Sequence, residues 1–149
     1  MKIKLMIALT LVSVNVIADD SQLPTRSAIV FSRDLRPSDG DLATLTLTKQ
    51  ADGRYGASLY EDHFDRIAKK EVEQTTPISA NLKCDFMLDT AQNLKKMTCS
   101  NDLRMLDGAL TELTVTADAS SGWYTAALRT VVRQRDNTQT LVGDLRLMP

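Results

Sequence analysis

The single histidine of the chain, His63, lies in an acidic stretch, Glu61-Asp62-His63-Phe64-Asp65. Carboxylates beside an imidazole can bind a metal ion or orient the ring for acid–base catalysis. Such a site usually needs a second histidine or a free cysteine, and no serine lies in a Gly-x-Ser-x-Gly nucleophile motif. We therefore expect a solvated acidic loop with no catalytic residue, metal or cofactor. A metal ion held by this cluster is the alternative.

A second acidic stretch contains Asp34, Asp39, Gly40 and Asp41. Its spacing departs from that of a calcium-binding loop and predicts a turn rich in aspartate hydrogen bonds instead. Glycine motifs that hold phosphates or dinucleotides are absent from the sequence, and nothing selects two of its nineteen acids as a glycosidase pair. The sequence favours a protein that is not an enzyme, and a small hydrolase that uses Asp or Glu with His63 is the third hypothesis.

Two features could serve recognition. Trp123 is expected to point outward beside a Ser-Ser-Gly loop, where it could anchor a protein partner or, alternatively, fold over the end of the domain as a plug. Arg129, Arg133 and Arg135 are expected on one outward strand face that could contact carboxylates or anionic glycans. Pairing with neighbouring acids, Asp144 among them, is the alternative for these arginines.

Cys84 and Cys99 are the only cysteines of the chain. In an exported protein such a pair usually forms a disulfide, and a redox pair would favour a Cys-x-x-Cys spacing. We therefore predict a structural bridge, and closing a loop of this length contributes roughly 3 kcal/mol in the chain-entropy model.

Export itself is predicted from the first eighteen residues. Lys2 and Lys4 precede an apolar run from Leu5 to Val12, and small residues lead to a cleavage site after Ala18. The segment is too short to span a bilayer in the usual way, so a retained anchor is the weaker alternative. We expect a signal peptide at 1–18, a single β domain at 19–149, and a periplasmic or secreted, bacterial location.

The charge of the chain is nearly balanced, with 18 basic and 19 acidic residues. Basic and acidic residues are well mixed, so nucleic-acid binding has no electrostatic support. No apolar run is long enough for a membrane-spanning helix. The non-core positions are polar and aromatic residues make up only 5% of the chain, which argues against a lipid-facing barrel.

Alternation of apolar and polar residues predicts the strands. Residues 42–48 place Ala43, Leu45 and Leu47 on one face, and residues 55–60 alternate again. A two-residue turn would set Leu45 opposite Tyr60, whereas pairing Gln50 with Arg54 sets it opposite Leu59. Register therefore predicts a three-residue loop with Gly53 in a left-handed conformation.

The same alternation places on one face of a strand the residues Ile78, Ala80, Leu82, Cys84 and Phe86. If the two cysteines lie opposite each other on neighbouring strands, Phe86 faces Met97 and the disulfide lies in the core. Residues 89–96 are expected to hold a helical turn, and Phe64, Ile67 and Ala68 a short helix. Residues 136–138 are expected to form a loop, and Leu141, Gly143, Leu145 and Leu147 to point inward.

About eight strands result, near residues 27–33, 42–50, 54–62, 70–75 or 78–87, 97–103, 111–118, 123–135 and 139–148. Their short links predict an all-β antiparallel meander that closes as a small barrel, with a two-layer sandwich as the alternative. No internal repeat is apparent in the sequence. The leading functional hypothesis is an exported binding protein for a protein partner. A carrier of a small apolar ligand, with Ala80, Ala126 and Gly143 leaving interior space, is the alternative.

Overall fold

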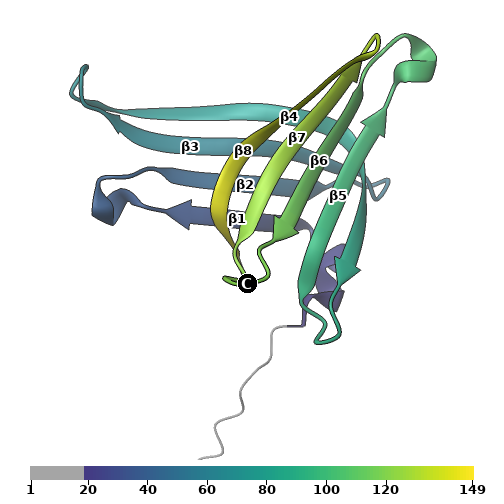
Figure 1. The fold of residues 1–149 in the computed structure, drawn as a ribbon, viewed down its shortest axis with the longest axis horizontal. Helices are drawn as coiled ribbons and strands as arrows, with labels where there is room; N and C mark the ends of the chain where they lie inside the picture. Colours follow the sequence, from purple (N-terminus) through teal and green to yellow (C-terminus); the bar gives the residue numbers. More distant parts are fainter. Residues whose placement is uncertain (1–18) are drawn as a thin grey trace, which may run out of the picture.

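The structure, a computed structural model, describes residues 19–149, so the predicted signal peptide lies outside the described residues. Eight antiparallel strands follow one another along the chain (Figure 1). They are β1 (Ala28–Asp34), β2 (Leu42–Lys49), β3 (Tyr55–Asp65), β4 (Lys70–Leu88), β5 (Leu94–Asp102), β6 (Leu110–Ala117), β7 (Tyr124–Val132) and β8 (Arg135–Leu147). Each strand pairs with the next and β8 pairs with β1, so the sheet closes into a ring with the connectivity of a barrel. The predicted all-β meander is confirmed.

The ring is folded into two layers whose strands cross steeply (Figure 1). β4 belongs to both layers, because residues 70–82 pair with β3 and residues 83–88 pair with β5. β8 likewise pairs with β7 and then, through Arg146 and Leu147, with β1. Strands that pass from one sheet to the other are the usual corners of an orthogonal packing.

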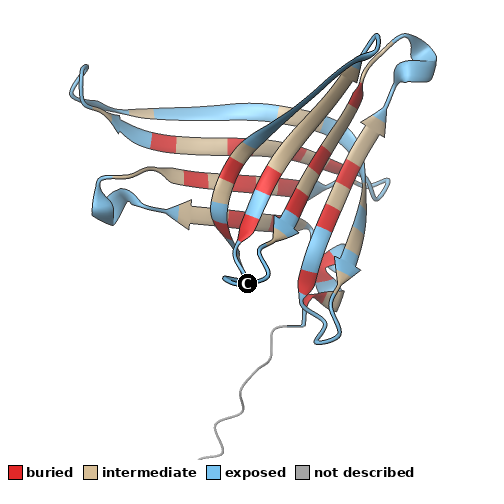
Figure 2. Ribbon diagram, viewed as in Figure 1, coloured by how far each residue is buried: buried red, intermediate tan, exposed pale blue. Residues whose placement is uncertain are grey.

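The core lies between the layers and shows the predicted alternation (Figure 2). In β2, Ala43, Leu45 and Leu47 are fully buried and the threonines between them are more exposed. One end of the core is covered by a 3-10 helix that the sequence reading missed, η1 (Asp20–Thr25). Its Leu23 is fully buried, so η1 acts as the plug of this end.

The β2–β3 hairpin has the predicted register. Leu45 pairs with Leu59 and the amide of Gln50 donates to the carbonyl of Arg54. Gly53 closes the loop at φ +83°, a conformation that glycine adopts at little cost.

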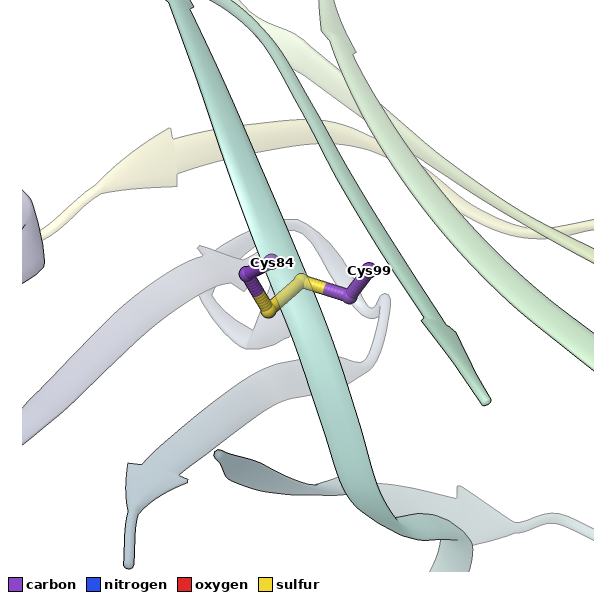
Figure 3. The surroundings of a disulfide bond; sticks show 2 residues. All are labelled: Cys84 and Cys99. Atoms are coloured by element: carbon purple, nitrogen blue, oxygen red, sulfur yellow. A yellow bond between two sulfur atoms is a disulfide. The ribbon is translucent and has the colours of Figure 1, made fainter. Parts of the chain in front are cut away.

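The predicted disulfide is present and joins neighbouring strands directly (Figure 3). Cys84 of β4 pairs with Cys99 of β5, and Phe86 faces Met97 as the parity required. Cys99 is fully buried and Cys84 packs against the core, so the bridge fastens the corner between the two layers from inside.

Two predicted helical segments are strands and tight turns instead. β3 continues to Asp65 and β4 begins at Lys70, so the expected helix over 64–68 is replaced by a turn that the Asp65 carboxylate caps. The helical turn expected within 89–96 is a three-residue hairpin loop between Asp89 and Asn93. In both places strand pairing satisfies more backbone groups than one isolated helical turn could.

The predicted alternation of inward and outward residues is wrong where β4 and β8 pass from one layer to the other. Asn81 and Asp144 adopt positive φ, 58° and 55°, and each lies in a region where strand register shifts. Such a bulge changes which face the following residues occupy. Ala80 is consequently exposed, and in β8 Val142 is buried where Gly143 was expected.

The end of the chain contains a further correction. Residues 136–138 belong to β8, and the turn lies earlier, at Arg133 and Gln134, which both have positive φ.

The chain contains an internal repeat, so the prediction that it has none was wrong. The segments Asp34–Leu42 and Asp102–Leu110 both read Asp-Leu-Arg-x-x-Asp-Gly-x-Leu. They form the matching 3-10 loops η2 (Arg36–Ser38) and η3 (Arg104–Leu106), each ending on an aspartate with φ 59°.

The repeat extends over both halves of the ring, β1–β4 and β5–β8. Tyr55 pairs with Leu82 beside the β4 bulge, as Tyr124 pairs with Leu145 beside the β8 bulge. The Cys84–Cys99 pair between β4 and β5 corresponds to the pairing of Leu147 with Phe31 between β8 and β1. The two halves therefore share one strand plan, and the disulfide is present in only one of the two corners.

Candidate recognition groove

A groove of about 920 Å³ opens at the end of the ring where η1, the β4–β5 turn, the β6–β7 loop and the end of β8 meet. This volume lies within the range of ordinary ligand-binding clefts. Apolar side chains such as Leu94, Ala117 and Met148 line it together with charged groups of both signs. The groove therefore offers an apolar surface with a polar rim, the usual composition of a protein interface.

Trp123 lies on this groove, at the end of the β6–β7 loop, with 40% of its surface exposed. The indole is neither buried core nor the plug of the domain end, because η1 fills that position. An aromatic ring held partly open beside a cleft is the arrangement that anchors many partners.

Arg146 of β8 holds the indole from one side. Its guanidinium carbon lies 5.1 Å from the centroid of the Trp123 ring, within cation–π range. Arg146 also lines the groove, so the pair presents a flat aromatic surface and several hydrogen-bond donors together. The sequence alone does not connect Arg146 with Trp123, because only the β7–β8 register, in which Tyr124 pairs with Leu145, brings the two together.

Asp118 fixes the loop that carries Trp123. One oxygen of its carboxylate accepts from the amides of Ser120 and Ser121, each at 2.9 Å. The Asp118 amide donates to the carbonyl of Trp123 at 2.8 Å, and the Trp123 amide donates to the Ser121 hydroxyl. The hydrogen bonds from Ser120 and Ser121 lower the pKa of Asp118 to about 2, so the carboxylate is ionised at neutral pH.

The floor of the groove is fixed by two buried polar contacts on Leu94. The Asp20 carboxylate of η1 accepts from the Leu94 amide at 2.6 Å, and the Tyr124 hydroxyl donates to the Leu94 carbonyl at 3.0 Å. Burial raises the pKa of Tyr124 to about 12, and its phenol stays protonated. These contacts join η1, β5 and β7 among the residues that line the groove.

The three arginines proposed as a stripe do not share one strand face. Arg129 of β7 makes a two-pronged ion pair with Asp136 of β8, with a shortest distance of 2.7 Å. Arg133 lies in the β7–β8 turn and Arg135 begins β8. They therefore gather around one hairpin, at the end of the fold where η3 lies and away from the residues that line the groove (Figure 1).

His63 and the acidic stretches are placed elsewhere again. His63 is exposed on the long β3–β4 hairpin, beside a small polar recess of about 270 Å³ that Arg36 and Glu71 also line. Asp62 is buried and accepts from Arg36 at 3.3 Å. Among residues 19–149, no group of three or more His, Cys, Asp or Glu side chains is arranged to hold a metal ion.

The residues expected to leave space inside a barrel do not gather there. Ala126 is fully buried in the packed core, whereas Ala80 is exposed. A side chain added at Gly143 would come within 3.7 Å of the hydroxyl of Thr125, an exposed residue.

Comparing the two halves of the internal repeat shows which residues near the groove occur in both halves and which occur only at the groove. Gly53 and Tyr55 of the first half correspond to Gly122 and Tyr124 of the second, and both tyrosines are buried. Between them, Trp123 corresponds to Arg54. A hairpin with a glycine at positive φ thus forms at the corresponding place without tryptophan, although its loop is one residue shorter than the loop between β6 and β7.

Comparison of the chain with protein-family models, with curated proteins and with solved structures finds no match. Within residues 19–149, no helix has the length and apolar character needed to cross a membrane.

Proposed function

We propose that this chain is an exported, non-enzymatic binding protein that receives a segment of a protein partner in the groove beside Trp123. The observation that carries the proposal is the half-open indole stacked on Arg146 at the edge of a cleft. Tryptophan and arginine are the residues that most often dominate binding energy at protein interfaces. The fixed loop and the paired floor keep both in place before the partner arrives, which lowers the entropy lost on binding.

Export to an oxidising compartment, periplasmic or extracellular, is part of this proposal and is supported by the disulfide. Cleavage after Ala18 would leave Asp19 in place, whose carboxylate caps the first turn of η1 through the Ser21 amide at 2.9 Å. The mature chain would thus keep the plug that forms one wall of the groove.

Affinity isolation from the exported fraction of the source cells tests the proposal. The immobilised chain should retain a partner that Trp123→Ala loses, while Phe64→Ala, an exposed aromatic on the β3–β4 hairpin, retains it. Trp123→Ala should change the free energy of unfolding by about 1 kcal/mol or less, because the side chain is half exposed. Equal retention by both variants would refute the groove as the binding site.

Native mass spectrometry of the same preparation distinguishes a carrier of a small apolar ligand from a protein that binds a protein partner. A bound small apolar molecule that survives in the Trp123→Ala variant would favour a carrier and count against the protein-binding groove.

A further inference from the structure

The η3 loop ends in two large apolar side chains that almost nothing covers. Met105 is 96% exposed and Leu106 is 80% exposed. Both belong to η3, which lies at the end of the fold away from the C-terminus, near the β7–β8 hairpin (Figure 1). Exposed apolar residues in a cluster, unlike single ones, commonly mark a surface that meets a partner.

The internal repeat shows that the loop does not need these residues to fold. In η2 the same two positions are Pro37 and Ser38. The hydrogen bonds are nonetheless the same, with the amide at the second position donating to a leucine carbonyl at 2.9 Å in both loops. Met105 and Leu106 are therefore additions to a loop whose backbone is already determined by its Asp-Leu-Arg and Asp-Gly residues.

The neighbouring β7–β8 hairpin supplies further apolar surface and positive charge. Val132 is 43% exposed and precedes Arg133 and Arg135, neither of which makes an ion pair with any residue of 19–149.

The acids of this end are mostly neutralised. Asp102 pairs with Arg104 at 2.6 Å and Asp136 with Arg129 at 2.7 Å, whereas Glu112, farther along β6 from the tip, shares Arg129 at 3.9 Å and keeps most of its charge. Asp107 is the only remaining acid of the η3 loop and is outnumbered by the two unpaired arginines.

We propose that the η3 loop and the β7–β8 turn together dock this protein on an anionic lipid bilayer surface. Met105 and Leu106 would enter the headgroup and upper acyl region, and Arg133 and Arg135 would contact lipid phosphates. Protruding apolar tips beside unpaired cations are the elements of interfacial membrane attachment. Neither of the two clefts described above is lined by residues of the η3 loop or of the β7–β8 turn, so a lipid surface fits this protruding end better than a protein segment does.

Sedimentation with vesicles tests the proposal on the mature full chain. The wild-type protein should bind phosphatidylglycerol–phosphatidylcholine vesicles and bind phosphatidylcholine vesicles weakly. Met105→Pro combined with Leu106→Ser copies the tip of η2 and should weaken binding about ten-fold or more. Proline is tolerated there because no hydrogen bond of the loop uses the Met105 amide. Arg133→Gln combined with Arg135→Gln should weaken binding about ten-fold and remove its salt dependence.

Ile67→Ser is the matched control, since Ile67 is 97% exposed at the tip of the other long hairpin. It should bind vesicles as the wild type does, and all variants should keep the wild-type melting temperature. No vesicle binding by the wild type, or equal loss in the Ile67 variant, would overturn the proposal. Concentration-dependent dimers that vanish in the Met105/Leu106 variant would also overturn it, because the surface would then meet a second copy.

Discussion

At the scale of single residues, the groove depends on side chains whose charge and hydrogen bonds are fixed before any partner binds. Trp123 is held between the Asp118 loop and Arg146, and the floor is held by Asp20 and Tyr124. Preorganisation of this kind lowers the entropy lost when a partner binds. Hydrogen bonds lower the pKa of Asp118 to about 2 and burial raises the pKa of Tyr124 to about 12, so these two groups keep one protonation state near neutral pH.

Asp118 gives a pH-dependent prediction. Its folded pKa, about 2, lies below the ordinary value of an aspartate, so its contribution to stability is present above about pH 4. That contribution is lost as pH falls towards 2. Asp118→Asn should lower the melting temperature at pH 7 and show a smaller decline between pH 4 and 2 than the wild type. The control Asp85→Asn, at an exposed residue without side-chain hydrogen bonds among residues 19–149, should keep the wild-type decline. If the melting temperatures of Asp118→Asn and of the wild type fell equally between pH 4 and 2, the lowered pKa of Asp118 would not contribute to stability as proposed.

Asp20 gives a stability prediction at the same scale. Asp20→Ala leaves the buried Leu94 amide without its acceptor and should cost about 1–3 kcal/mol in the free energy of unfolding. Asp19→Ala, which removes only an exposed cap of η1, should cost about 1 kcal/mol or less. Chemical denaturation of the two variants measures both values, and equal small losses would show that η1 does not fasten the groove.

At the scale of elements, the sequence was informative where geometry is local. The β2–β3 loop followed from parity and one glycine, and the facing of Phe86 and Met97 followed from the cysteines. Parity could not foresee the bulges at Asn81 and Asp144, because these positions bend β4 and β8 between two layers that only the whole fold defines. The η1 plug was missed for the same reason, since Leu23 is buried by strands distant in sequence.

The two repeated loops make a prediction about glycine. A Cβ at Gly108 would lie 2.6 Å from the Cβ of Leu103, and one at Gly40 would collide with Leu35 in the same way. Gly40→Ala and Gly108→Ala should each destabilise the fold by about 1–3 kcal/mol through overpacking. Gly56→Ala is the control, because the nearest atom there is 3.7 Å away. If only one of the two loop variants is destabilised, the loops are not structurally equivalent.

At the scale of the whole molecule, two similar halves carry different surfaces. The buried positions repeat, as with Tyr55 and Tyr124, while the exposed positions differ, as with Arg54 and Trp123. The contiguous motif Asp-Leu-Arg-x-x-Asp-Gly-x-Leu was present in the sequence and could have been found there. The other shared residues are spaced along strands and are offset by the extra residue of the β6–β7 loop, so only the strand pairing relates them. The differences identify Trp123 as a residue that the shared strand plan does not require. That difference, more than the groove alone, supports a recognition role at this end.

The most direct measurement uses the fact that Trp123 is the only tryptophan of the chain. Its fluorescence reports on the groove without a label. Titration with the isolated partner should change the emission of Trp123 in a saturable way, and Arg146→Gln should weaken that titration while keeping the fold. A partner that binds the chain with unchanged Trp123 emission, and binds Trp123→Ala as tightly as wild type, would contradict the account.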